Sequence, residues 1–411
     1  MTARATPLPP LFCASSATEM LSESWADLAT RAYGRLQGRR REVRDWSELP
    51  RDDADGIRRV LLEDPSYVPG VARSPIATWR VYRASAEATP GASGASAEAT
   101  AGATITVFCP DRRRLEALRP FLEAVLLPLL AATLELLREE GRLRNSSIAP
   151  FTFAFVPAGG RRRLPVRPRA PVLPDHINGG VTFGRERLVA VLRKEDACKV
   201  LVHELVHLAG LDSPIRPHAL PPDLEPALAK RYDVQQTLGK LGIAEAYTET
   251  LACFLYSVWL RLSGTPRTVG DVEGIASVLA GRIERIGTDV AAHFGRGGGR
   301  GAGRGKGRGT TGDRHRLLHV REGTHCFAYV FCRAALWRPP FLRRFLVDLY
   351  PPGSPPGSDA SGFLRLLVEA LDAWTARAVT PRARNAPNAP AASTAKTGPK
   401  AIGLCARGKP Y

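Results

Sequence analysis

The sequence predicts an α+β protein in which a small mixed sheet with some helices precedes a mainly helical C-terminal half. Short segments of alternating, β-forming residues cluster in the first half of the chain. Longer segments with helical periodicity follow residue 196. A run of strands followed by a run of helices is typical of the α+β class.

The predicted strands alternate in hydrophobicity and are bounded by turn-forming residues. They cover residues 77–85, 103–111, 150–158, 177–184 and 187–193. The first two are separated by residues 84–102, in which ASAEAT occurs twice, so this stretch predicts a low-complexity hairpin loop.

The predicted helices are recognised by apolar residues at helical spacing. They cover residues 25–37, 53–64, 112–142, 197–209, 224–242, 243–264, 269–294, 315–337, 340–350 and 362–378. The apolar run 121–137 holds two glutamates and Pro128, which makes it a poor membrane span. We expect a buried helix there and no membrane-spanning segment.

Composition divides the chain further. Residues 1–65 predict a partly disordered leader with short helices, and one domain is expected over 66–294 plus 313–378. The Gly/Arg run 295–312 cannot pack a core, so it predicts a disordered insert, as does the Pro/Ala/Lys tail 379–411.

Charge and cysteine content limit the surroundings of the protein. The net charge is +18, and 50 of the 58 basic residues are arginines, many of them in segments that look unfolded. The Gly/Arg run could therefore bind nucleic acid weakly. The seven cysteines show no CxxC spacing, and the N-terminus has no continuous apolar core. We expect an intracellular, cytoplasmic protein without a signal peptide.

The segment KVLVHELVHLAGLDS (199–213) holds two of the eight histidines, four residues apart. On a helix, His203 and His207 share a face and can reach one metal ion. Glu204 lies about 100° further round, where a base for an attacking water is needed. Asp196 is placed as an N-cap and Gly210 is placed to end the helix. The pattern predicts a catalytic metal site, although HExxH also arises by chance.

The residues around HELVH help to distinguish a metal site from a chance match. The helix is apolar nearly all round, apart from the His/Glu group. Unpaired polar groups are costly to bury, and a bound metal ion would remove that cost. The competing interpretation is a pair of hydrogen-bonded core histidines with a salt-bridged glutamate.

With HELVH and its flanks, the chain resembles the zincin metallopeptidases, which bind zinc through a third protein ligand. The metzincin branch does not fit. Ser213 stands at its third-ligand position, Asp212 is one residue out of register, and no methionine is available for its methionine turn.

The gluzincin branch, which takes a glutamate from a later helix, fits better. EAYTET (245–250) places Glu245 and Glu249 four residues apart. The resemblance, which covers residues 198–260 at the level of motifs, implies Glu245 as the third ligand. Glu249 would then be the carboxylate that orients a ligand histidine. The reverse assignment of these two glutamates stays open.

The resemblance also implies an edge strand before the active-site helix, to which a substrate adds by main-chain pairing. Gly180, Val181 and Thr182 are well placed for this role, although an ordinary hairpin fits them equally.

A hydrogen-bond donor to the transition-state oxyanion is expected as well. His325 and Tyr329 lie four residues apart in THCFAYVF, and His325 is the preferred candidate for this catalytic role. Tyr232, Tyr247 and His218 are others.

The resulting prediction is a zincin-like metallopeptidase domain that holds one zinc ion and cleaves a peptide or protein substrate, with Glu204 as the base. Two alternatives stay open. One is a nucleic-acid-associated protein that acts through its Arg/Gly segments. The other is a zincin-fold protein without catalytic activity.

Overall fold

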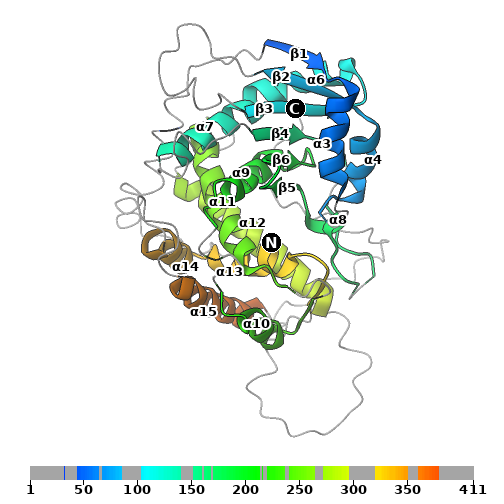
Figure 1. Ribbon diagram of the computed structural model, residues 1–411. Helices are drawn as coiled ribbons and strands as arrows, with labels where there is room; N and C mark the ends of the chain where they lie inside the picture. Colours follow the sequence, from blue (N-terminus) through cyan, green and yellow to red (C-terminus); the bar gives the residue numbers. More distant parts are fainter. Residues whose placement is uncertain are drawn as a thin grey trace, which may run out of the picture.

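The computed structural model confirms the α+β class, with a mixed sheet in one half and helices in the other (Figure 1). It describes Ala32 and residues 44–63, 67–85, 103–139, 151–159, 162–167, 170–212, 215, 220–236, 240–263, 272–295, 320–349 and 360–378. Most of the predicted 25–37 helix and 84–102 loop, nearly all of the 295–312 insert and the whole 379–411 tail lie outside these residues.

The sheet has the strand order β1-β2-β3-β4-β6-β5. Its strands are β1 (Arg44–Glu48), β2 (Arg80–Ser85), β3 (Ala103–Cys109), β4 (Phe151–Phe155), β5 (Gly180–Phe183) and β6 (Leu188–Val191). The central pairs β3/β4 and β4/β6 are parallel, whereas β1/β2, β2/β3 and β5/β6 are antiparallel. Within the described residues, β5 therefore forms an antiparallel edge strand. At the other edge, β1 lies inside residues 1–65, which the sequence predicts as a partly disordered leader with short helices.

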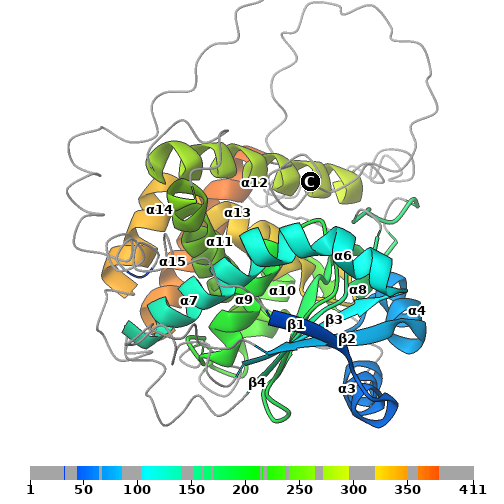
Figure 2. The same ribbon diagram turned by 90° about the horizontal axis from the view of Figure 1, so that it is seen from above.

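Alternating side chains divide the sheet residues between two cores, because successive residues of a strand face opposite ways. Ile105, Val107 and Phe153 belong to one core, while Phe108 and Ala154 belong to the other. Helices α3 (Arg51–Glu63) and α4 (Gly70–Thr78) cover the second face of the sheet, the one that carries Phe108 and Ala154. Figure 2 shows them opposite α6 and α7 across the strands.

The long apolar segment forms α6 (Arg112–Phe121), a π-helical turn η1 (Leu122–Leu126) and α7 (Leu127–Glu139) in direct succession. Part of it, Arg112–Leu137, is long and apolar enough to cross a bilayer by length and composition alone. However, 67% of its most apolar window is buried inside the protein. It packs on the first face of the sheet as a core helix.

The predicted HELVH helix is α9 (Ala197–Leu208), which follows β6 and packs beside β5, β6 and α7. Gly210 has φ = 64° and follows its last turn, as predicted. Asp196 stands at the N-cap but makes no capping bond with its side chain. Its carboxylate pairs instead with the buried guanidinium of Arg162, an ionic partner that the local sequence did not indicate.

Helices form the second half of the protein. They are α10 (Leu224–Tyr232), α11 (Ile243–Leu262), α12 (Val272–Gly295), η4 (Phe327–Cys332), α13 (Arg333–Leu336), α14 (Pro339–Arg344), η5 (Phe345–Leu349) and α15 (Ala360–Ala378), besides the short α8 (Pro174–Ile177) in the first half. Figure 1 shows α9 and α11 between the sheet and the remaining helices.

Two predicted helices were wrong in part. The 224–242 helix ends at Tyr232, because Asp233 adopts a left-handed conformation with φ = 52°. The chain then forms β7 (Val234–Gln236), which pairs in parallel with β8 (Val320–Glu322) inside the predicted 315–337 helix. These strands are stabilised by a partner more than eighty residues away, so helical periodicity could not reveal them.

Candidate metal centre

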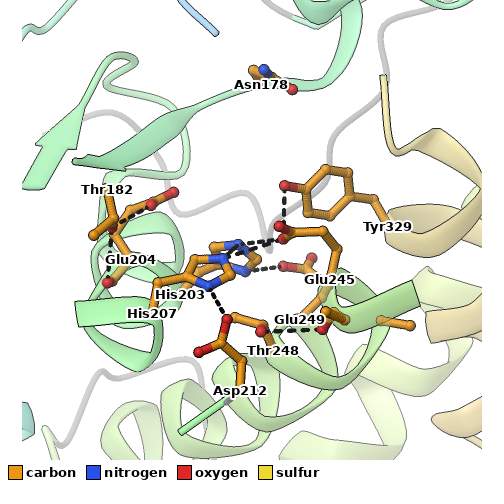
Figure 3. A network of polar contacts seen from close by, with 12 residues as sticks. Asn178, Thr182, His203, Glu204, His207, Asp212, Glu245, Thr248, Glu249 and Tyr329 are labelled. Atoms are coloured by element: carbon orange, nitrogen blue, oxygen red, sulfur yellow. Dashed lines mark hydrogen bonds and ion pairs between the residues drawn. The ribbon is translucent and has the colours of Figure 1, made fainter. Parts of the chain in front are cut away.

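Two helices bring the three predicted ligands together. His203 and His207 project from α9, and Glu245 projects from the first turn of α11. The two Nε2 atoms are 3.1 Å apart, and Glu245 Oε2 lies 3.2 Å from His203 Nε2 and 3.3 Å from His207 Nε2. Figure 3 shows the three side chains converging. This group could hold a metal ion.

The size of this triangle fits a tetrahedral ion. Bonds of about 2.0–2.1 Å, as zinc makes to nitrogen and oxygen, require tetrahedral ligand atoms roughly 3.3 Å apart. The observed separations of 3.1–3.3 Å agree with that requirement. The side chains of His207 and Glu245 keep 18% and 19% of their surface exposed. Solvent can therefore reach the ligands from this side, as a catalytic site with an open position needs.

Each histidine is oriented by a carboxylate behind it. Glu249 Oε2 lies 3.0 Å from His203 Nδ1, and Asp212 Oδ2 lies 2.9 Å from His207 Nδ1. A proton on each Nδ1 leaves each Nε2 free to bind a metal. The geometry thus assigns Glu245 to the ligand group and Glu249 to the orienting position. It also gives Asp212, which the sequence places one residue out of register for a metzincin ligand, the same orienting role.

In the metal-free protein these carboxylates hold protons on the imidazoles. Burial lowers the pKa of His207, but Glu245 and Asp212 outweigh it and raise this pKa well above its ordinary value. The pKa of His203 is raised in the same way, against burial, by Glu245 and Glu249. A metal ion must therefore displace protons in order to bind.

The start of α11 is fixed by contacts outside the ligand group. Glu225 accepts hydrogen bonds from the backbone N–H groups of Leu241 and Ile243, at 2.9 and 3.0 Å. Gly242 precedes the helix with φ = 65°, a left-handed conformation that glycine adopts without steric cost. The position of Glu245 thus depends on this rigid entry to the helix.

The edge strand β5 holds the predicted base. Thr182 Oγ1 contacts Glu204 Oε2 at 2.8 Å and the Glu204 carbonyl oxygen at 3.0 Å. A Cβ at Gly180 would lie 2.7 Å from Glu204 Oε1 and 2.5 Å from Val200 Cγ1, so only glycine leaves room for this carboxylate. Glu204 is buried, and this burial raises its pKa. A carboxylate with a raised pKa is suited to take up a proton.

The three predicted substrate residues therefore do not all face the same way. Gly180 and Thr182 face α9 and its Glu204, whereas Val181 packs against the second core. Only their main chain, on the free side of the edge strand, stays a candidate for pairing with a substrate.

Glu249 lies in a strongly cationic setting. Lys199 Nζ is 2.7 Å from both of its oxygens, and Arg333 Nη1 is 2.5 Å from Oε1. All three side chains are buried. Burial alone would raise the pKa of Glu249, but Lys199 and Arg333 outweigh it and hold this pKa well below its ordinary value.

His325, the preferred candidate for the oxyanion donor, lies with its ring against Gly242, at whose position a Cβ would be 2.3 Å from His325 Nδ1. Tyr329, one turn later, points to the ligands instead: its hydroxyl donates to Glu245 Oε2 at 3.0 Å (Figure 3). Of the two candidates that the sequence offered in THCFAYVF, Tyr329 is thus the one that contacts the ligand group. The sequence held no signal to favour the tyrosine over the histidine.

The other candidates for this role lie elsewhere or outside the described residues. Tyr232 donates to Asp372 Oδ1 at 2.9 Å. The ring of Tyr247 packs edge-on against Phe345 and Phe363 in the core. His218 falls outside the described residues.

Comparisons with known protein families, with curated proteins and with solved structures found no match to this chain.

Proposed function

We propose that the protein is a zinc-dependent metallopeptidase of the zincin type, related to the gluzincin branch. The observation that carries the proposal is the ligand triangle of His203, His207 and Glu245 with Glu204 beside it. A structural zinc site has no need of an adjacent base. An antiparallel edge strand next to the HExxH helix, as β5 provides, is a second support.

The ligand set favours zinc over harder ions. Two imidazoles and one carboxylate with an open position are typical of catalytic zinc, whereas magnesium and calcium prefer oxygen ligands. When bound, zinc would activate a water molecule and polarise a peptide carbonyl.

The side chains of the protein would supply the proton transfers and the alignment. Glu204 takes a proton from the attacking water and returns it to the leaving amine. Thr182 holds the Glu204 carboxylate in place, while the main chain of β5 aligns an extended peptide along the edge of the sheet. Base and substrate would thus be positioned by one strand.

Metal content tests the proposal first. We would purify the protein without chelator and measure bound metal by mass spectrometry in the wild type, His203→Ala, Glu204→Gln and His293→Ala. One zinc per chain is expected in the wild type, in Glu204→Gln and in the control His293→Ala, whose histidine lies on α12. His203→Ala should lose it. A folded wild type without stoichiometric metal would contradict the proposal.

Activity then separates an enzyme from an inactive zincin. A peptide library should reveal cleavage by the wild type, reduced in Glu204→Gln by about 10²- to 10⁴-fold, the usual contribution of a general base. If the wild type binds zinc but cleaves no more peptide than Glu204→Gln, the result would support the inactive zincin.

A further inference from the structure

Two helical segments meet at the metal centre in register. Glu245 and Glu249 are one turn apart on α11, and Tyr329 and Arg333 are one turn apart on the continuous segment η4–α13. Tyr329 contacts Glu245, and Arg333 contacts Glu249. An ExxxE pattern on one helix is thus matched, residue for residue, by a YxxxR pattern from the C-terminal half.

We infer that Tyr329 and Arg333 are positioning residues that complete the metal centre from the C-terminal half of the chain. Tyr329 fixes the ligand oxygen of Glu245. Arg333, together with Lys199, fixes Glu249 and through it the ring of His203. The inference rests on the metal-binding part of the proposed function and adds residues that lie far from HELVH in sequence.

The contact of Tyr329 selects one oxygen of the ligand carboxylate. Its hydroxyl donates to Glu245 Oε2, the same atom that lies within 3.3 Å of both Nε2 atoms. A carboxylate oxygen has two lone pairs. One can accept this hydrogen bond while the other faces the metal position. The centroid of the Tyr329 ring also lies 5.7 Å from that of the His203 ring, so Tyr329 packs directly against one of the ligands.

The backbone that carries Tyr329 is unusual. Residues Phe327–Cys332 form a π-helical turn, and Tyr329 donates its own N–H to the His325 carbonyl at 2.9 Å. π-Helical turns within helices are frequent at functional sites. The buried carboxylate of Glu322 anchors the start of this turn, because it accepts from Phe327 N at 2.8 Å.

The contact of Arg333 acts on His203 through Glu249. Arg333 has no exposed surface, and Glu249 keeps only 1% of its own. Glu249 Oε1 accepts hydrogen bonds from Arg333 and Lys199, and Oε2 accepts them from Lys199 and His203 Nδ1. Such outer partners of a metal-binding histidine fix the orientation of its ring, and their loss typically weakens metal binding about 10–100-fold.

Zinc affinity of the full-length protein tests this inference. It would be measured by competition with a chromogenic chelator for the wild type, Tyr329→Phe and Arg333→Met. Each variant should raise the zinc Kd about 10–100-fold. Tyr232→Phe removes a buried phenol that bonds to Asp372, away from the metal centre, and should leave the Kd unchanged. Arg333→Lys keeps the charge without the planar fork, so it should lose affinity less than Arg333→Met.

Circular dichroism of each metal-free variant establishes that it is folded. If Arg333→Met does not fold, Arg333→Lys takes its place, with a Kd about tenfold above that of the wild type expected. A wild-type Kd, within about twofold, in folded Tyr329→Phe and in the folded Arg333 variant would overturn the inference.

Two further outcomes are separable. If Tyr329→Phe loses turnover but keeps the wild-type Kd, Tyr329 acts on the substrate, and its positioning role is wrong. If the wild type itself binds no zinc, the proposed function fails first and the inference fails with it. The absorption spectrum of the cobalt-substituted protein gives a second reading, because displaced ligands change the cobalt bands.

Discussion

The two sides of the metal centre treat their carboxylates in opposite ways. On the sheet side, Glu204 meets the neutral hydroxyl of Thr182, and its pKa is raised by burial. On the helical side, Glu249 meets the cations Lys199 and Arg333, and its pKa is held well below the ordinary value despite burial. Glu245, beside the two histidines, has a lowered pKa as well.

This contrast matches the different tasks that the proposed function assigns to these carboxylates. Titratable groups whose surroundings push their pKa values apart identify acid/base roles. A carboxylate that exchanges protons needs a raised pKa, while one that binds a metal or orients a ligand histidine must stay ionised. Glu249 bonds to a lysine and an arginine, whereas the Glu204 side chain bonds to a threonine hydroxyl, so the two settings suit the two roles. Breaking each of these contacts tests the contrast.

Glu249→Gln should be the most destabilising of these changes. It removes the anion from Lys199 and Arg333, which are 6% and 0% exposed. Removing one partner of a buried ion pair costs about 3–5 kcal/mol. Denaturant unfolding in excess EDTA measures this cost without any contribution from metal. Glu245→Gln is the matched control and should cost less, because Glu245 contacts no lysine or arginine in the described part of the chain. An equal cost in the two variants would contradict the proposed difference.

Thr182→Val should slow catalysis and leave metal binding intact. Valine keeps the shape of threonine but cannot donate to Glu204. A hydrogen bond to a charged group contributes about 1.5–3 kcal/mol, so turnover of a cleavable peptide should fall about 10- to 100-fold. Thr182→Ser keeps the hydroxyl and should recover most of the rate. Zinc content, measured in parallel, should match that of the wild type. Loss of zinc in Thr182→Val would place Thr182 in metal binding instead.

Stabilisation by zinc should grow as the pH rises above about 6.5. The raised pKa of His207 means that protonation stabilises the metal-free fold. This contribution is complete below the unfolded pKa and is lost as the pH rises through the folded pKa. In the zinc-bound protein both histidines are neutral throughout, so its stability does not fall for this reason as the pH rises.

Thermal unfolding with zinc and with EDTA, from pH 6 to pH 8.5, measures this effect. The difference in Tm should widen by a few degrees, since roughly 1 kcal/mol corresponds to a few degrees for a protein of this size. His207→Ala should abolish the trend. A difference that narrows with rising pH would be inconsistent with protonated ligands in the metal-free state.

Several features of the centre follow from local spacing alone. His203 and His207 share a face because they are four residues apart on a helix, and so do Glu245 and Glu249. The apolar surroundings of HELVH predicted a buried helix, and α9 is buried along most of its length. The strand 177–184 was expected before this helix, and β5 occupies it as an edge strand.

Other features needed contacts between distant segments. Thr182, Lys199, Tyr329 and Arg333 reach their partners from 22 to 84 residues away. None of them belongs to a recognisable motif around HELVH. The same holds for β7 and β8, which pair across a long stretch of chain. A local pattern carries no information about such partners, because they are chosen by how the helices and the sheet pack.

The sequence by itself determined which residues could bind a metal, because helical periodicity fixes the faces of α9 and α11. It left open which glutamate joins the histidines. That was decided by the packing of α11 against α9, which sets Glu245 within 3.3 Å of both Nε2 atoms and Glu249 behind His203 at Nδ1. Residues one turn apart on a helix share a face but lie at different heights along it, so only the relative position of the two helices could assign their roles.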